Sequence, residues 1–195
     1  LLFEAQRHSP EHPLVLNAAG LQALDSGQFG AAEQLFRRAI AKDGGNPAFF
    51  VNLATTLRRQ NRLDEEIEAL DAALVAHPRH LFALLQKAAL FGLRGRPRES
   101  ALTYSYALAT VTDEHAMPPA LRAAIEHARQ VVRDNNDALD AFMRPQLDDA
   151  RAGAADTETG RFDHGLQTFL GRSRIYTAQP TLFALPGLPA IEFFP

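Results

Sequence analysis

The chain has 195 residues, of which 46% are hydrophobic and 22% charged, with a formal net charge of −3 and no cysteine. This acidic balance argues against a nucleic-acid-binding protein, which needs a concentrated basic face, and the absence of cysteine excludes disulfides and thiolate metal ligands. Charged residues interrupt every apolar stretch well before the roughly 20 residues that span a membrane. We therefore expect a soluble, cytoplasmic chain with no nucleic-acid partner and no membrane partner.

Small and bulky apolar residues recur every 34 positions from Pro13 to about Thr112. The small residues are Gly20, Ala54 and Ala88 and again Ala39, Ala73 and Ala107, and the bulky ones are Phe36, Leu70 and Tyr104. Each unit predicts two amphipathic helices, in which a small residue lets a bulky residue of the neighbouring helix come close. A period of this length is typical of helical repeats that stack into a solenoid.

Turn-forming residues separate the predicted helices. Gly27, Asn61 and Gly95 stand where the first helix of each unit must end, because these residue types enter a left-handed backbone conformation at the least cost. Between units, Asn46-Pro47 and His77-Pro78 mark the second turn, since proline disfavours helix in the residue before it.

The same spacing extends back to the start of the chain. Leu2, Ala5 and Pro10 stand two periods before Leu70, Ala73 and Pro78 of the second unit. We therefore expect the chain to begin inside the second helix of an earlier repeat and to be a fragment of a longer protein.

Together, the recurring small, bulky and alanine positions and the prolines at this spacing resemble the tetratricopeptide repeat (TPR). The resemblance covers roughly residues 13–112, although Glu66 and Ser100 replace the alanine that Ala32 supplies in the first unit. The expected fold is all-α, with three repeats and a preceding half repeat forming an α-solenoid over residues 1–112.

The resemblance implies that the inner faces of the first helices form a concave groove for a protein or peptide ligand. In this register the groove residues are Asn17, Leu21, Val51, Asn52, Thr55, Arg58, Arg59, Phe82, Leu85 and Gln86, with Leu24 and Ala89 beside them. The amides can pair with a peptide backbone, the two arginines can receive a carboxylate, and the apolar residues can contact apolar side chains. In the alternative interpretation, the apolar residues seal the seam between helices and the arginines are solvated.

A carboxylate clamp of the kind found in chaperone-binding TPR proteins is not expected in this groove. The resemblance would call for lysine near position 17, asparagine near 21 and basic residues near 82 and 86. The chain has Asn17, Leu21, Phe82 and Gln86 there, and Asn52 alone fits the pattern.

Residues 113–151 predict a longer helix after the repeats. An apolar stripe with steps of four and three runs along it through Leu121, Ile125, Ala128, Val132, Asn135, Leu139 and Phe142. The stripe favours a helix that caps the last repeat, and the alternative is a coiled-coil dimer joined through residues 118–143. The protein is accordingly expected to be a monomer or a weak dimer.

The chain changes character after Arg151. Residues 152–160 have almost nothing to bury and predict a flexible linker, whereas residues 161–195 are rich in β-prone and aromatic residues. The run from Arg161-Phe162 through Tyr176 and Gln179-Pro180 to Pro186-Gly187-Leu188-Pro189 resembles the entry to the oxygenase domain of the aspartyl/asparaginyl β-hydroxylase family. Residues 161–195 would then be the N-terminal edge of a truncated β-rich domain.

This second resemblance implies an intact parent that uses Fe(II) and 2-oxoglutarate as a dioxygenase, with the repeats presenting a substrate to the catalytic domain. The iron-binding histidines would lie beyond Pro195, so this chain is expected to hold no catalytic residue, metal ligand or cofactor. Asp163-His164 is a poor metal pair, because adjacent residues point different ways from a helix or strand. The alternative function is a stand-alone TPR adaptor or scaffold with no catalytic activity.

Overall fold

The computed structural model describes residues 9–151, 163–168 and 170. Three expectations lie outside these residues: the half repeat at the start of the chain as far as residue 8, the linker 152–160, and the strand-prone part of segment 161–195. The chain divides into two compact units, of which one ends at Val132 and the other begins at Arg133.

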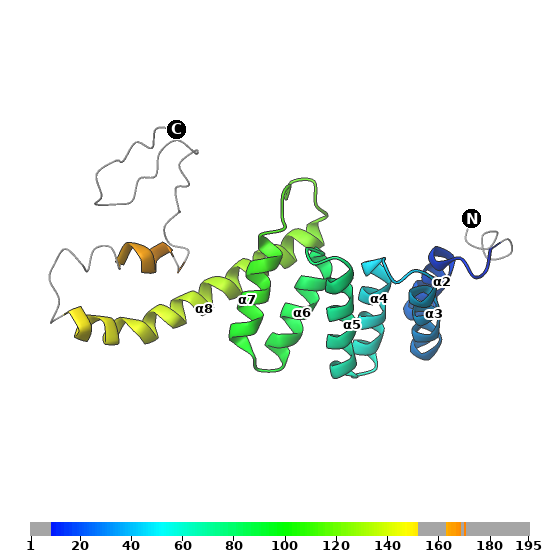
Figure 1. Ribbon diagram of the computed structural model, residues 1–195, viewed down its shortest axis with the longest axis horizontal. Helices are drawn as coiled ribbons and strands as arrows, with labels where there is room; N and C mark the ends of the chain where they lie inside the picture. The colour runs from blue at the N-terminus through cyan, green and yellow to red at the C-terminus, as the bar shows by residue number, and fades with distance from the viewer. Residues whose placement is uncertain (1–8, 152–162, 169, 171–195) are drawn as a thin grey trace, which may run out of the picture. The chain divides into compact units, whose positions relative to one another are not determined.

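Paired antiparallel helices make up most of the first unit. The pairs, which follow one another along the chain from blue to green in Figure 1, are α2 (Pro13–Asp25) with α3 (Phe29–Lys42), α4 (Pro47–Arg59) with α5 (Leu63–Ala76), and α6 (Leu81–Leu93) with α7 (Pro97–Leu108). A long helix, α8 (Pro119–Arg151), begins in this unit and continues into the next. The helix pairs have the period that the sequence predicts.

The first helix of each pair begins and ends at the predicted residues. The side chains of His12, Asn46 and His80 each accept a hydrogen bond from a backbone N–H of the first turn, which satisfies a donor that the helix itself leaves unpaired. After each of these helices, Gly27, Asn61 and Gly95 have φ of 72°, 59° and 68°. The left-handed residue lets the chain reverse direction into the second helix of the pair.

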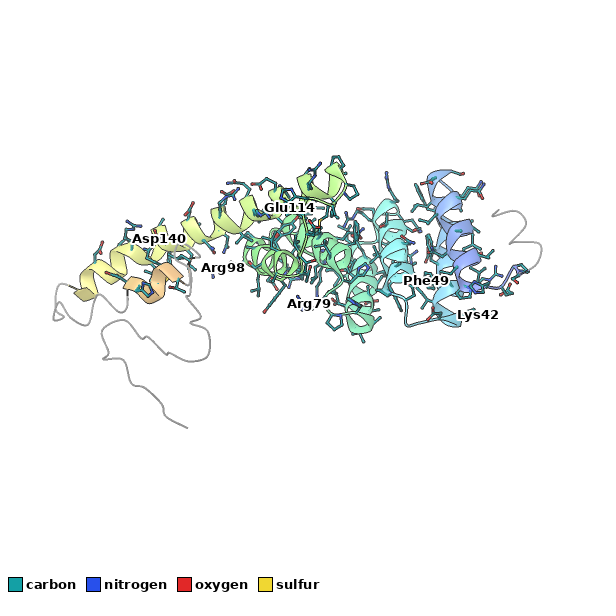
Figure 2. The ribbon with its side chains drawn as sticks, turned by 90° about the horizontal axis from the view of Figure 1, so that it is seen from above. Lys42, Phe49, Arg79, Arg98, Glu114 and Asp140 are labelled. Carbon is teal, nitrogen blue, oxygen red and sulfur yellow. The ribbon has the colours of Figure 1, made fainter. Side chains whose placement is uncertain are left out.

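Close packing inside each pair follows the alternation of small and bulky residues. A Cβ placed on Gly20 would lie 2.6 Å from the Phe36 ring, so any larger residue between α2 and α3 at this point would force the ring to shift. Leu70 and Tyr104 are buried in the later pairs, as Phe36 is in the first. Between the first two pairs, Phe49 of α4, labelled in Figure 2, packs with Leu16 and Ala39.

The first part of α8 covers the last pair of helices. Its residues Leu121, Ala124, Ala128 and Val132 pack with a buried cluster on α6 and α7 that includes Leu85 and Tyr104. The rings of Tyr104 and His127 meet edge to face, with their centroids 5.9 Å apart. Glu114, labelled in Figure 2, pairs with Arg129 of α8 and so ties the preceding loop to the helix. This part of α8 therefore caps the solenoid, as the apolar stripe predicts.

The second unit contains the rest of α8 and a short helix at residues 163–168. Asn136 donates a side-chain hydrogen bond to the carbonyl oxygen of Leu170, and Leu170 is buried. Asp140 is also buried and pairs with Arg144 one turn later. Phe142, the last residue of the predicted apolar stripe, is 63% exposed, so the buried stripe does not continue to the end of the helix.

Candidate peptide-binding groove

Polar side chains on α2, α4 and α6 contact one another along one face of the first unit. Asn52 donates a side-chain hydrogen bond to Asn17, with Nδ2 and Oδ1 2.8 Å apart. On the next helix, Gln86 donates to the hydroxyl of Thr55, with Nε2 and Oγ1 3.3 Å apart. Four of the predicted groove residues therefore form a ladder across three successive first helices.

The predicted apolar residues divide between this face and the core. Val51 is buried in a cluster with Leu53 and Leu57, where it packs in the seam between helices. Phe82 is 52% exposed, and Leu21 is also exposed. The first helices thus present Leu21 and Phe82 as apolar side chains with free surface.

A cavity of about 500 Å³ lies where α6 meets the start of α8. Its size falls within the roughly 300–1,000 Å³ of typical ligand pockets. The residues that line it come from α4, α6, α7 and α8 and from the loop before α8, and they are Arg58, Phe82, Leu85, Gln86, Ala89, Tyr104, Pro118, Ala120, Leu121, Ala124 and His127. The cavity walls are therefore mostly apolar, with a few polar groups among them.

Sequence reasoning found one side of this cavity and missed the other. The α4 and α6 residues were predicted as groove residues, whereas Tyr104 and the residues from Pro118 to His127 were not. The apolar stripe that begins at Leu121 was the available signal, since a cap that buries this stripe must lie against the last pair of helices.

Arg58 and Glu66 form an ion pair beneath the groove. Glu66 of α5 is fully buried, and its Oε1 accepts hydrogen bonds from Nε of Arg58 at 2.6 Å and from the terminal guanidinium nitrogen at 2.5 Å. The Arg58 side chain is 34% exposed, and its guanidinium also donates to the backbone carbonyl oxygen of Gln86. The predicted carboxylate receptor is therefore already paired with a carboxylate of the chain itself.

Two polar atoms near the cavity are buried without a hydrogen-bond partner among the residues that the structure describes. They are Oε2 of Glu66 and Oε1 of Gln86. Tyr104 also lines the cavity, and burial raises the pKa of its phenol although the charge of Arg58 opposes the change. The phenol therefore stays protonated and can donate a hydrogen bond at neutral pH.

Arg59, the other predicted carboxylate receptor, differs from its neighbour in the chain. Its side chain is exposed, and it forms no ion pair with the residues that the structure describes. The adjacent arginines at the end of α4 therefore have different surroundings, one held by a buried carboxylate and one in solvent.

Comparison with known proteins agrees with this geometry. Residues 17–80 match the family model of the tetratricopeptide repeat. The described helices form a TPR solenoid. The all-α solenoid fold predicted from the sequence is therefore confirmed. No curated protein matches the chain.

Solved TPR structures share the fold at low sequence identity. The TPR domain of Arabidopsis OM64 is 18% identical with a TM-score of 0.52, and the match covers 62% of this chain and 96% of that one. The Yersinia enterocolitica type III secretion chaperone SycD, in complex with a peptide of the translocator YopD, is 14% identical with a TM-score of 0.55 and coverage of 61% and 88%. The first TPR domain of Spaghetti (RPAP3), bound to the HSP90 peptide SRMEEVD, is 16% identical with a TM-score of 0.54 and coverage of 63% and 94%. These identities show a common fold alone.

The described residues were also compared with what a metal site and a membrane-spanning helix require. No group of three or more histidine, aspartate or glutamate residues there could hold a metal ion. None of the helices searched there combines the length and apolar character needed to cross a membrane. Segment 161–195, for which the sequence led us to expect an oxygenase domain, lies outside the described residues apart from residues 163–168 and 170, so that expectation stays a prediction.

Proposed function

We propose that the first unit binds a peptide segment of a partner protein along α2, α4 and α6. The observation that carries this proposal is the ladder of amide and hydroxyl side chains that leads to an open, apolar cavity. Amide side chains can both donate to and accept from a peptide backbone, and an apolar cavity can bury a side chain of the ligand. The peptide complexes of SycD and Spaghetti support the proposal, because they are TPR proteins of the same fold.

Residues 161–195 support a finer proposal, in which the groove presents a substrate to an oxygenase domain in a longer protein. Its only support is the resemblance to the aspartyl/asparaginyl β-hydroxylase family. Iron-dependent conversion of 2-oxoglutarate to succinate by the full gene product tests this finer proposal. Absence of that conversion would reject it in favour of the adaptor function. A location in the cytoplasm likewise stays a prediction.

Selection from a display library of short random peptides tests peptide binding by the full chain. The matched variants are Ala120→Trp and Ala123→Trp, since both alanines are exposed at the start of α8 but Ala120 alone lines the cavity. We expect the wild type and Ala123→Trp to enrich a common set of peptides, and Ala120→Trp to lose at least about tenfold in affinity for them, because the indole fills the cavity. Equal binding by both variants would exclude the cavity, and a library with no enriched peptide would exclude the proposed function.

A further inference from the structure

One buried position beneath the groove changes character from repeat to repeat. Ala32, Glu66 and Ser100 stand 34 residues apart on the second helices, and all three are buried. The first unit has a methyl group at this position, the third has a small hydroxyl, and the second has a carboxylate. A carboxylate is retained inside a protein only when other groups compensate its charge.

The compensating charge comes from the groove. The guanidinium of Arg58 reaches Oε1 of Glu66 through two nitrogens and meets the backbone carbonyl of Gln86 with one of them. Arg58 also lines the cavity. The charge that Arg58 would offer to a ligand is therefore cancelled from below by Glu66.

This pairing makes the part of the groove around Arg58 unsuitable for an acidic group of a ligand. An incoming carboxylate at Arg58 would compete with Glu66 for the same N–H donors. It would also place a second negative charge close to the buried carboxylate, and two like charges repel strongly at short distance in surroundings of low polarity. An uncharged apolar side chain meets no such penalty, and the walls formed by Leu85, Leu121 and Ala124 would bury it.

We propose that Glu66 determines the ligand class of this groove: by neutralising Arg58, it makes the cavity accept an uncharged, bulky apolar side chain of a peptide and reject a carboxylate. The proposal rests on the proposed peptide-binding function. Glu66 acts through Arg58 and does not touch the ligand, so it is a positioning residue. Its removal changes which peptides bind rather than whether peptides bind.

Selection from the same library by the full-length wild type, Glu66→Ala and Glu66→Gln tests this role. Glu66→Ala restores the residue type of the first unit, and Glu66→Gln keeps a hydrogen-bond acceptor for Arg58 without the charge. We expect the wild type to enrich peptides with a bulky apolar residue and no acidic residue beside it. Both variants should shift toward acidic peptides by at least about tenfold, the ratio that a charge-assisted hydrogen bond supplies.

Two control variants separate the charge of Arg58 from general effects on the fold. Ser100→Ala changes the same repeat position without a change of charge, and it should keep the wild-type preference. In the double variant Glu66→Ala with Arg58→Gln, the acidic preference should disappear, because the receiving cation has gone. Thermal unfolding of each variant shows that the solenoid is intact.

The outcomes distinguish this proposal from the one on which it rests. If no peptide is enriched by the wild type, peptide binding itself fails. If peptides are enriched but the wild type already prefers acidic ones, or if folded Glu66→Ala and Glu66→Gln keep the wild-type preference, Glu66 does not set the ligand class although the groove binds peptides.

Discussion

Two arginine–glutamate clusters join neighbouring helices of this solenoid, and they differ in how fully the buried carboxylate is paired. The groove pair is Arg58 with Glu66, in which the carboxylate is fully buried. The turn network surrounds Glu33 of α3, which contacts Arg37 on its own helix and Arg62 at the start of α5. Gln60 donates a further hydrogen bond to Glu33, and Arg62 also holds Glu65. The turn network connects the first pair of helices to the second, whereas the groove pair lies under the surface that we propose for binding.

This difference indicates different roles for the same kind of interaction. Burial opposes ionisation of Glu33, but the hydrogen bonds from Gln60 and Arg62 and the charges of both arginines lower its pKa. Ionised Glu33 therefore stabilises the junction between repeats. The groove pair has a buried carboxylate with one unpaired oxygen. A buried pair is weak evidence for added stability, since desolvation offsets its attraction. The Arg58–Glu66 pair instead changes the charge that the groove presents to a ligand.

Arg58→Ala should have the largest effect on stability. The free energy of unfolding is expected to fall by about 3–5 kcal/mol, because the buried carboxylate of Glu66 is left without its cation. Glu66→Ala should cost less, about 1–2 kcal/mol, since the partly exposed guanidinium can turn to water. Chemical denaturation of both variants measures the difference. Equal losses would contradict the unequal burial of the two partners.

Glu33→Gln should have an intermediate effect that depends on pH. Because the pKa of Glu33 is lower in the folded protein, its stabilising contribution is present above the ordinary value of 4.5 and is lost as the pH falls through the folded value. The variant should be about 1 kcal/mol less stable than the wild type at neutral pH. This deficit should shrink as the pH falls below 4.5 and vanish below the pKa of Glu33 in the folded protein. A deficit that is constant with pH would show that the charge of Glu33 has no part in it.

Arg59→Ala should have the smallest effect. The side chain is exposed and has no ion pair among the described residues, so the free energy of unfolding should change by less than about 0.5 kcal/mol. Chemical denaturation of Arg59→Ala in parallel with Arg58→Ala compares the contributions of two adjacent arginines on one helix to the free energy of unfolding. A loss similar to that of Arg58→Ala would show that position on α4, and not the buried partner, decides the cost.

The repeat spacing made the helices and their turns predictable. The steric requirement at Gly20 and the left-handed backbone at Gly27, Asn61 and Gly95 are local, so they leave a direct trace in residue type. The same register placed the side chains of Asn17 and Asn52 on one face, where they meet. Periodicity carries this information because each repeat places equivalent residues in equivalent surroundings.

The electrostatic state of the groove was not predictable from that spacing. Glu66 was recognisable as a departure from alanine, but its contact with Arg58 depends on how two long side chains cross between α4 and α5. The cavity was missed for a related reason. The path of α8 depends on a single loop and on the packing of Leu121 and Ala124. These residues lie outside the 34-residue repeat, so the repeat register does not place them.

Hydrogen–deuterium exchange of the full chain, with and without a library-selected peptide, tests most directly whether this face of the solenoid binds the ligand. We predict that the peptide slows exchange in α4, in α6 and in the first turns of α8, where the ladder and the cavity lie. Exchange in α3 should stay unchanged, because none of its residues belongs to either feature. Slower exchange confined to α3, α5 and α7, with α6 and the start of α8 unaffected, would contradict binding in the groove.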